Sequence, residues 1–153
     1  MAEQPGATAG PREVFAAMKQ QWLGNSVDAM DSLLADDAVI EGPFAPPGRP
    51  RRFVGREEFL AFARPERASF PVRFEECRET AVHDTADPEV IVVEYELTGT
   101  VTTTGHRATA PFIGVLRARN GQIVGWREYQ DKAAIARALG QIRVKQWEDG
   151  QPS

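Results

Sequence analysis

The last alternating segment of the chain carries the residue with the clearest potential for acid–base chemistry. Residues 123–129 read IVGWREY, and the alternation of an extended strand puts Val124, Trp126 and Glu128 on one face. The other face then receives the remaining large side chains, Ile123, Arg127 and Tyr129. Burial of a carboxylate among apolar groups raises its pKa, and such a carboxyl can act as a general acid or base near neutral pH. The alternative is an edge glutamate that pairs with a helix arginine such as Arg137.

A tyrosine in an earlier segment could bring a phenol to the same place. Ile91, Val93, Tyr95 and Leu97 form one apolar face of residues 89–98. If this face meets the face that carries the carboxylate, phenol and carboxyl converge in an apolar cavity, where a phenol can donate a hydrogen bond to a developing oxyanion. The alternative is a core tyrosine whose hydroxyl reaches water.

The remaining polar candidates are weaker. Residues 42–55 read GPFAPPGRPRRFVG, and their prolines and glycines predict an irregular loop that could close over a pocket and hold a substrate carboxylate through Arg49. The alternative is a solvated surface loop. His83 and His106 fall in predicted turns, and Cys77 has no activating neighbour, so we expect it to pack as a small apolar residue.

The composition describes an ordinary globular chain and excludes several function classes. The 153 residues, 42% of them hydrophobic and 26% charged, predict one domain. A formal net charge of −4 and short apolar runs give no reason to expect nucleic acid or a membrane as a partner. One cysteine and two histidines argue against a metal site, and no phosphate-binding glycine motif predicts a nucleotide, so no cofactor is expected. No signal peptide is visible, and the single cysteine predicts a cytoplasmic protein.

Hydrophobic periodicity predicts helices first and a sheet second. Residues 1–11 are expected to be a disordered lead-in, residues 12–140 a single domain and residues 141–153 a polar tail. The helices are predicted at about 11–23, 27–36, 56–64 (stopping before Pro65) and 132–139, and the strands at 38–42, 71–82, 89–102, 107–119 and 122–130. This order predicts an α+β fold, with the helices on one face of an antiparallel sheet.

Four stretches of the sequence resemble the nuclear-transport-factor-two-like, or ketosteroid-isomerase-like, superfamily. They are LLADDAVIEGPF (33–44), GREEFLAF (55–62), VVEYELTGTV (92–101) and FIGVLRARNGQIVGWREYQD (112–131). The last is similar to the closing hairpin of limonene epoxide hydrolase, SnoaL-like polyketide cyclases and PhzA/PhzB proteins. The resemblance implies a curved antiparallel sheet wrapped by helices into a cone with an apolar pocket (a cystatin-like α+β barrel), and a homodimer.

The resemblance also favours some activities of this superfamily over others. Ketosteroid isomerase has its base where this chain has Gly42, and its oxyanion-binding residues where this chain has Met18 and Ile113, so that mechanism is not expected. Of the five residues that limonene epoxide hydrolase uses, only one is conservatively replaced, by Glu128; its water-holding residues fall near Ile40 and Gly42. Epoxide hydrolysis is therefore a weaker hypothesis. The SnoaL-like and PhzA/PhzB-like branches resemble this chain in relying on an acidic residue of the last strand.

These arguments lead to one hypothesis and one alternative. The hypothesis is a cofactor-independent cyclase or isomerase of secondary metabolism, in which Glu128 shuttles a proton and Tyr95 orients it or stabilises an oxyanion. The residues expected to line the pocket around an apolar substrate are Trp126, Phe44, Ile113, Leu97, Ile40, Met18, Trp22 and Arg49. The alternative is a non-catalytic protein of the same fold that binds a small molecule or dimerises with a partner.

Overall fold

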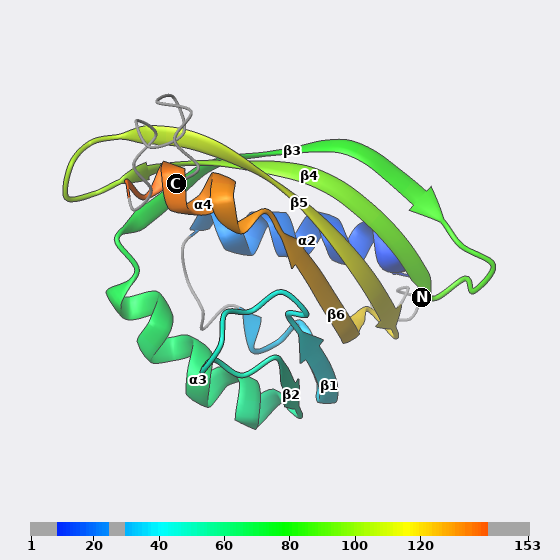
Figure 1. Ribbon diagram of the computed structural model, residues 1–153. Helices are drawn as coiled ribbons and strands as arrows, with labels where there is room; N and C mark the ends of the chain where they lie inside the picture. The colour runs from blue at the N-terminus through cyan, green and yellow to red at the C-terminus, as the bar shows by residue number, and fades with distance from the viewer. Residues whose placement is uncertain (1–8, 25–29, 141–153) are drawn as a thin grey trace.

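Three helices lie against one curved sheet in the computed structural model, which describes residues 9–24 and 30–140 (Figure 1). The elements follow the order α2 (Pro11–Gly24), β1 (Leu34–Glu41), β2 (Arg52–Val54), α3 (Arg56–Ser69), β3 (Val72–Asp84), β4 (Val90–Val101), β5 (Arg107–Arg119), β6 (Gln122–Gln130) and α4 (Lys132–Ala138). The predicted α+β class and the curved sheet are confirmed. Residues 1–8 of the lead-in predicted at 1–11 and the predicted tail at 141–153 lie outside the described residues, and helix α2 already begins at Pro11.

The six strands of the sheet are arranged in the order β2-β1-β6-β5-β4-β3. The strands β3 to β6 form antiparallel neighbours, and the predicted Asn120-Gly121 turn joins β5 to β6 with both residues at positive φ. The first long strand, β1, pairs in parallel with β6, the last one, so the prediction of a wholly antiparallel sheet is wrong at this pair. Alternation specifies the faces of a strand but not its neighbours, which is why the sequence did not indicate this pairing.

The helix α2 covers the concave face of the sheet. Its residues Val14, Phe15 and Met18 are buried, as the predicted helical spacing requires. The helix α3 continues through Pro65 to Ser69, so the prediction that it ends before the proline is wrong. Contacts of its last turns favour the longer helix, because Glu66 bonds Arg49 and Arg67 lies over the ring of Phe74.

The predicted helix at 27–36 is wrong over residues 30–36, the part that the structure describes. Residues 25–29 lie outside the described residues, residues 30–33 form a turn, and strand β1 begins at Leu34. Leu34 and Ala38 are fully buried, and the backbone N–H of Ile123 donates to the carbonyl of Leu33. Pairing with a buried strand therefore outweighs the local helical pattern. A second correction concerns the predicted irregular loop at 42–55, since its residues Arg52–Val54 form strand β2 beside β1.

A β-bulge near the start of β6 changes which face some residues occupy. The register shifts between Arg117 and Ala118, so that Arg117 pairs with Gly125 while Ala118 pairs with Ile123. Ile123 is therefore fully buried in the core, and its predicted outward orientation is wrong. Beyond the bulge the alternation is regular, and it directs Trp126, Glu128 and Gln130 to the concave face.

Candidate functional site

A tyrosine, a glutamate and a glutamine meet on the concave face of the sheet. The Tyr95 hydroxyl, from the middle of β4, donates a hydrogen bond to Glu128 Oε2 at 2.6 Å. The Gln130 side-chain amide, at the end of β6, donates to Glu128 Oε1 at 3.0 Å. The convergence of Tyr95 and Glu128 follows from the sheet, because Tyr95 pairs with Phe112 and Glu128 with Gly114, two residues of β5 on the same face of the sheet.

Aromatic rings surround this polar group. The ring of Tyr95 stacks on Phe112 at 5.4 Å and on Trp22 at 5.3 Å between centroids. Phe15 and Trp126 lie within 6.3 Å of the same ring. Tyr95 is only 1% exposed, so its orientation is fixed by packing on all sides.

The environment shifts the pKa of both groups upward. Burial raises the pKa of the Glu128 carboxyl, and the hydrogen bonds from Tyr95 and Gln130 oppose this rise because they favour the carboxylate. Burial and the neighbouring Glu128 raise the pKa of Tyr95 well above its ordinary value. The phenol therefore keeps its proton at neutral pH and donates it to the carboxylate as a hydrogen bond.

Glu128 lines two cavities, and Trp22 and Gln130 also line both of them. The first, here called the α4 chamber, has a volume of about 380 Å³. Its walls are mostly apolar side chains from the sheet and α4, among them Val72, Phe74, Leu97, Val101, Ala110 and Ile135. The second, the loop chamber, has a volume of about 400 Å³, and its walls include Met18, Ile40, Pro46, Arg49, Phe53 and Trp126. Glu128 is thus accessible from two apolar compartments.

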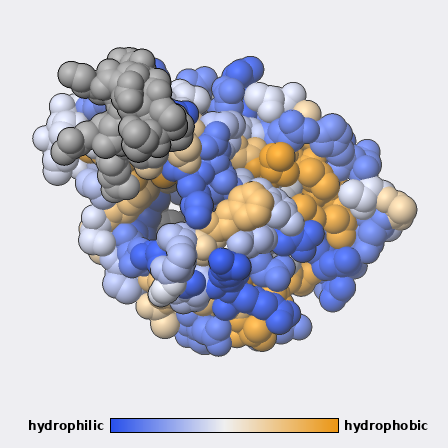
Figure 2. Space-filling view, in the orientation of Figure 1, coloured by the Kyte–Doolittle hydropathy of each residue, from blue (hydrophilic) through white to orange (hydrophobic). Residues whose placement is uncertain are grey.

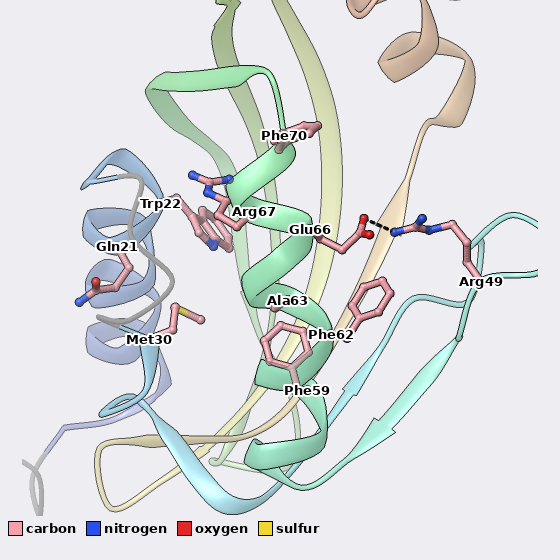
Figure 3. Close-up of a pocket in the computed structure, with 10 residues that line it drawn as sticks. All are labelled: Gln21, Trp22, Met30, Arg49, Phe59, Phe62, Ala63, Glu66, Arg67 and Phe70. Carbon is pink, nitrogen blue, oxygen red and sulfur yellow. Dashed lines mark hydrogen bonds and ion pairs between the residues drawn. The ribbon is translucent and has the colours of Figure 1, made fainter.

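A third hollow of about 330 Å³ lies between α2 and α3 and does not include Glu128 or Tyr95 (Figure 3). It adjoins the loop chamber, since Trp22, Met30 and Arg49 line both. Arg49 Nη2 bonds Glu66 Oε1 at 2.6 Å, and its guanidinium lies 5.2 Å from the centroid of the Phe62 ring. Arg49 therefore lines the loop chamber and is bonded to α3.

The structure brings together most of the residues predicted for the pocket. Trp22 lines both chambers, Leu97 lines the α4 chamber, and the loop chamber is lined by Met18, Ile40, Arg49 and Trp126. Phe44 and Ile113 are not among the lining residues of either chamber. Both lie on the opposite face of the sheet, 51% and 43% exposed, beside Tyr129. On β5 the neighbours Phe112 and Gly114 occupy the inward positions, which turns Ile113 outward.

Two features of the site were missed in the sequence. Gln130 continues the alternation of Trp126 and Glu128 by one more step, so the pattern itself could have indicated it. Gly114 lies directly beneath the ring of Trp126, where a Cβ atom would overlap the ring. No short sequence motif predicts this contact, because it depends on the pairing of β5 with β6.

The other candidates are not part of the site. The predicted alternative of an ion pair between Glu128 and Arg137 is absent among the described residues, where Glu128 bonds Tyr95 and Gln130 instead. His83 is exposed and bonds Glu94, and burial raises the pKa of the Cys77 thiol to about 11, which makes it unreactive. Over the described ranges 9–24 and 30–140, no cluster of three or more His, Cys, Asp or Glu residues could hold a metal ion. Within the same ranges, none of the helices has the length and apolar character that a membrane crossing needs.

The comparisons with known proteins agree with this architecture. The family described as SnoaL-like domain matches residues 12–126. An uncharacterized PhzA/B-like protein of Pseudomonas aeruginosa is 34% identical over 112 residues, which is 73% of this chain and 77% of the relative.

Solved structures share the fold, among them two bacterial proteins. A proposed isomerase of Bacillus subtilis superposes with a TM-score of 0.76 at 24% identity, covering 93% of this chain and 98% of the other. The proposed polyketide cyclase IdmH of Streptomyces antibioticus superposes with a TM-score of 0.67 at 20% identity, covering 86% and 99%. At these identities the likeness shows the fold, and it confirms the predicted cone architecture.

Proposed function

Because the chain belongs to the SnoaL-like domain family, we propose that it is a small-molecule enzyme that cyclises or isomerises an apolar substrate by acid–base chemistry without a cofactor. Membership also confirms the resemblance on which the hypothesis was based. One observation carries the proposal, namely a carboxyl group of raised pKa held by a buried phenol between two apolar chambers. A passive apolar binder has no need of a carboxylate at this place.

Glu128 is the group that would accept and return the proton. Its Oε2 is held by Tyr95 and its Oε1 by Gln130, so the carboxylate is oriented before a substrate arrives. A positioned general acid–base group contributes about 10²–10⁴-fold to a rate. The rest of the acceleration would come from the apolar walls, which fold the substrate so that its reacting atoms lie close together. This division suits an intramolecular ring closure or a proton shift.

The role proposed for Tyr95 is to position Glu128. Its hydroxyl already donates to Oε2, and its side chain is almost wholly buried, so it has no free donor to direct at a substrate oxyanion. Its raised pKa keeps the donor protonated over the physiological range. Of the two roles considered in the sequence, orientation of the carboxylate is therefore the better supported.

A non-catalytic binder remains the second candidate, and one observation favours it. Both carboxylate oxygens of Glu128 are already hydrogen-bonded by the protein, as in a purely structural polar cluster. The experiment that separates the two is a thermal-shift screen of apolar carbonyl compounds, in which each well is then analysed by mass spectrometry. Conversion of a stabilising compound by the wild type, lost in Glu128→Gln, supports the enzyme. Equal stabilisation of both proteins without conversion supports the binder.

We also propose that the protein works as a cytoplasmic homodimer. The outer face of the sheet presents exposed Phe44 and Ile113, and Figure 2 shows apolar side chains gathered over β4 and β5 among hydrophilic ones. An apolar patch with a charged rim is typical of a protein–protein interface. Light scattering after size-exclusion chromatography would test the dimer directly.

A further inference from the structure

Gln130, at the end of β6, presents its side-chain amide to Glu128, the proposed proton carrier. The mechanism above gives this amide no role beyond holding the carboxylate. Gln130 Nε2 lies 3.0 Å from Glu128 Oε1, the oxygen that Tyr95 does not hold. A carboxylate is an acceptor only, so the NH₂ end of the amide must face it while Glu128 is ionised. Once Oε1 carries a proton, that oxygen is a donor and only a weak acceptor, so an NH₂ group facing its O–H would place two donors against each other.

A glutamine can satisfy both states if its amide turns over. We propose that Gln130 is a positioning residue whose side-chain amide rotates when Glu128 Oε1 gains a proton, so that its NH₂ group donates to the carboxylate and its carbonyl oxygen accepts from the carboxylic acid. This inference rests on the proposed function, since it describes how one site supports both halves of a proton transfer. Methionine, leucine or lysine at this position could not provide both bonds.

The surroundings of Gln130 permit this rotation. The last torsion of a glutamine side chain is broad and roughly two-fold, so the turn has a low barrier. Gln130 lines both chambers, which gives its amide open space, and among the described residues no hydrogen bond is made to its side-chain oxygen. Its backbone is fixed, because β6 pairs it with Phe112 and Asp131 caps α4 directly after it. Only the amide is therefore left to move.

Few other charges face Glu128. The titratable group that β4 presents to it is the Tyr95 phenol, which can keep its bond to Oε2 in both states because the proton goes to Oε1. Across the α4 chamber the charged lining residue is Arg67 on α3, and across the loop chamber the lining charges are Glu41 on β1 and Arg49 in the loop. The side chain that α2 contributes to both chambers is the uncharged Trp22. The response of Gln130 is thus the main adjustment available when the proton arrives.

The experiment compares wild type with Gln130→Met, which keeps the size of the side chain and removes both its donor and its acceptor. The matched control is Gln122→Met at the other end of β6, where the side-chain amide contacts backbone carbonyl oxygens near Leu34. The pKa of Glu128 is followed by carbon NMR of its carboxyl group, and the melting temperature is measured above and below that titration. The melting temperatures are also compared in a Glu128→Leu background, where the loss caused by Gln130→Met should disappear if Gln130 acts through Glu128 and should persist if its role is merely structural. Neither measurement needs a substrate, so failure of this inference is distinguishable from failure of the proposed enzyme activity.

A rotating amide stabilises both states of Glu128. Gln130→Met is then expected to lower the melting temperature on both sides of the titration, while the pKa of Glu128 moves by less than about half a unit. If Gln130 only donates to the carboxylate, the pKa rises by about one unit or more and the melting temperature falls only above the titration. That result overturns the inference. An unchanged pKa of Glu128 and an unchanged melting temperature in Gln130→Met would overturn it as well. Gln122→Met, which removes an amide far from Glu128, is expected to leave the pKa of Glu128 unchanged.

Discussion

Replacement of Glu128 by glutamine is expected to stabilise the protein at neutral and alkaline pH while it abolishes turnover. The buried carboxyl has a raised pKa, so between the unfolded value of about 4.3 and the native value the folded protein binds more protons than the unfolded chain. The free energy of unfolding of the wild type must therefore fall as the pH rises through this window, and the loss is complete above the native pKa. Glutamine carries no charge to bury, so the variant lacks this loss.

The size of the effect follows from the shift itself. Each unit by which burial raises the pKa of Glu128 is worth about 1.4 kcal/mol, which corresponds to roughly 3–6 °C in melting temperature for a domain of this size. Glutamine keeps the shape of the side chain and an oxygen that can accept from Tyr95, so the packing of the aromatic rings around it is retained. The gain should then approach the full linkage value.

Urea unfolding from about pH 4 to about pH 9 measures this difference. The two proteins should be closest in stability at the acidic end, and the variant should gain steadily as the pH rises. Glu96→Gln is the matched control, because Glu96 lies on the outer face of β4, where it bonds the exposed Arg78. A constant gap between Glu128→Gln and wild type over the whole range would refute the reasoning, since it would mean that Glu128 does not titrate abnormally.

Three further substitutions test the carboxylate site, the packing of the sheet and the proposed dimer interface. Tyr95→Phe removes the donor to Glu128 and is expected to lower turnover roughly ten- to hundred-fold in steady-state assays, because a hydrogen bond to a charged group is worth about 1.5–3 kcal/mol. Gly114→Ala places a methyl group against the Trp126 ring and should destabilise the fold by about 1–3 kcal/mol in calorimetry. Ile113→Arg puts a charge on the outer apolar face and should convert a dimer into monomers in light scattering.

Each of these has a matched control. Tyr129→Phe removes a hydroxyl that bonds Arg127 on the outer face, so an equal loss of turnover in both variants would contradict the role of Tyr95. Gly42→Ala adds a methyl group where no atom lies within 4 Å, and a similar loss of stability there would contradict the packing argument for Gly114. Ile113→Leu keeps the apolar surface, so loss of the dimer in this variant too would argue against the proposed interface.

The contact between Tyr95 and Glu128 could be predicted because it needs only alternation along two strands and one correct assumption about which faces meet. The orientation of Ile113 could not, since Phe112 and Ile113 are both large and apolar and the run is hydrophobic on both sides. Its wrong assignment followed from the resemblance to ketosteroid isomerase, which put Ile113 at an oxyanion-binding position, whereas β5 turns this residue outward.

The start of β1 was missed for a different reason. Leu33 and Leu34 fit a helical pattern with Val27 and Met30, and nothing local distinguishes that pattern from a turn followed by a buried strand. The strand is favoured over the helix because β1 pairs in parallel with β6, about ninety residues later in the chain. A short window of sequence cannot predict a pairing between strands that are so far apart in the chain.

The position of β6 between β1 and β5 also has a consequence for how the protein is made. A ribosome that has released residues up to the Asn120-Gly121 turn has supplied every strand except the one that bears the carboxylate. At that stage β1 and β5 have no neighbour on the sides that later hold β6, so the two parts of the sheet are not yet joined. Insertion of β6 therefore unites the sheet and completes the site in a single late event, and the nascent chain has two exposed strand edges to protect until then.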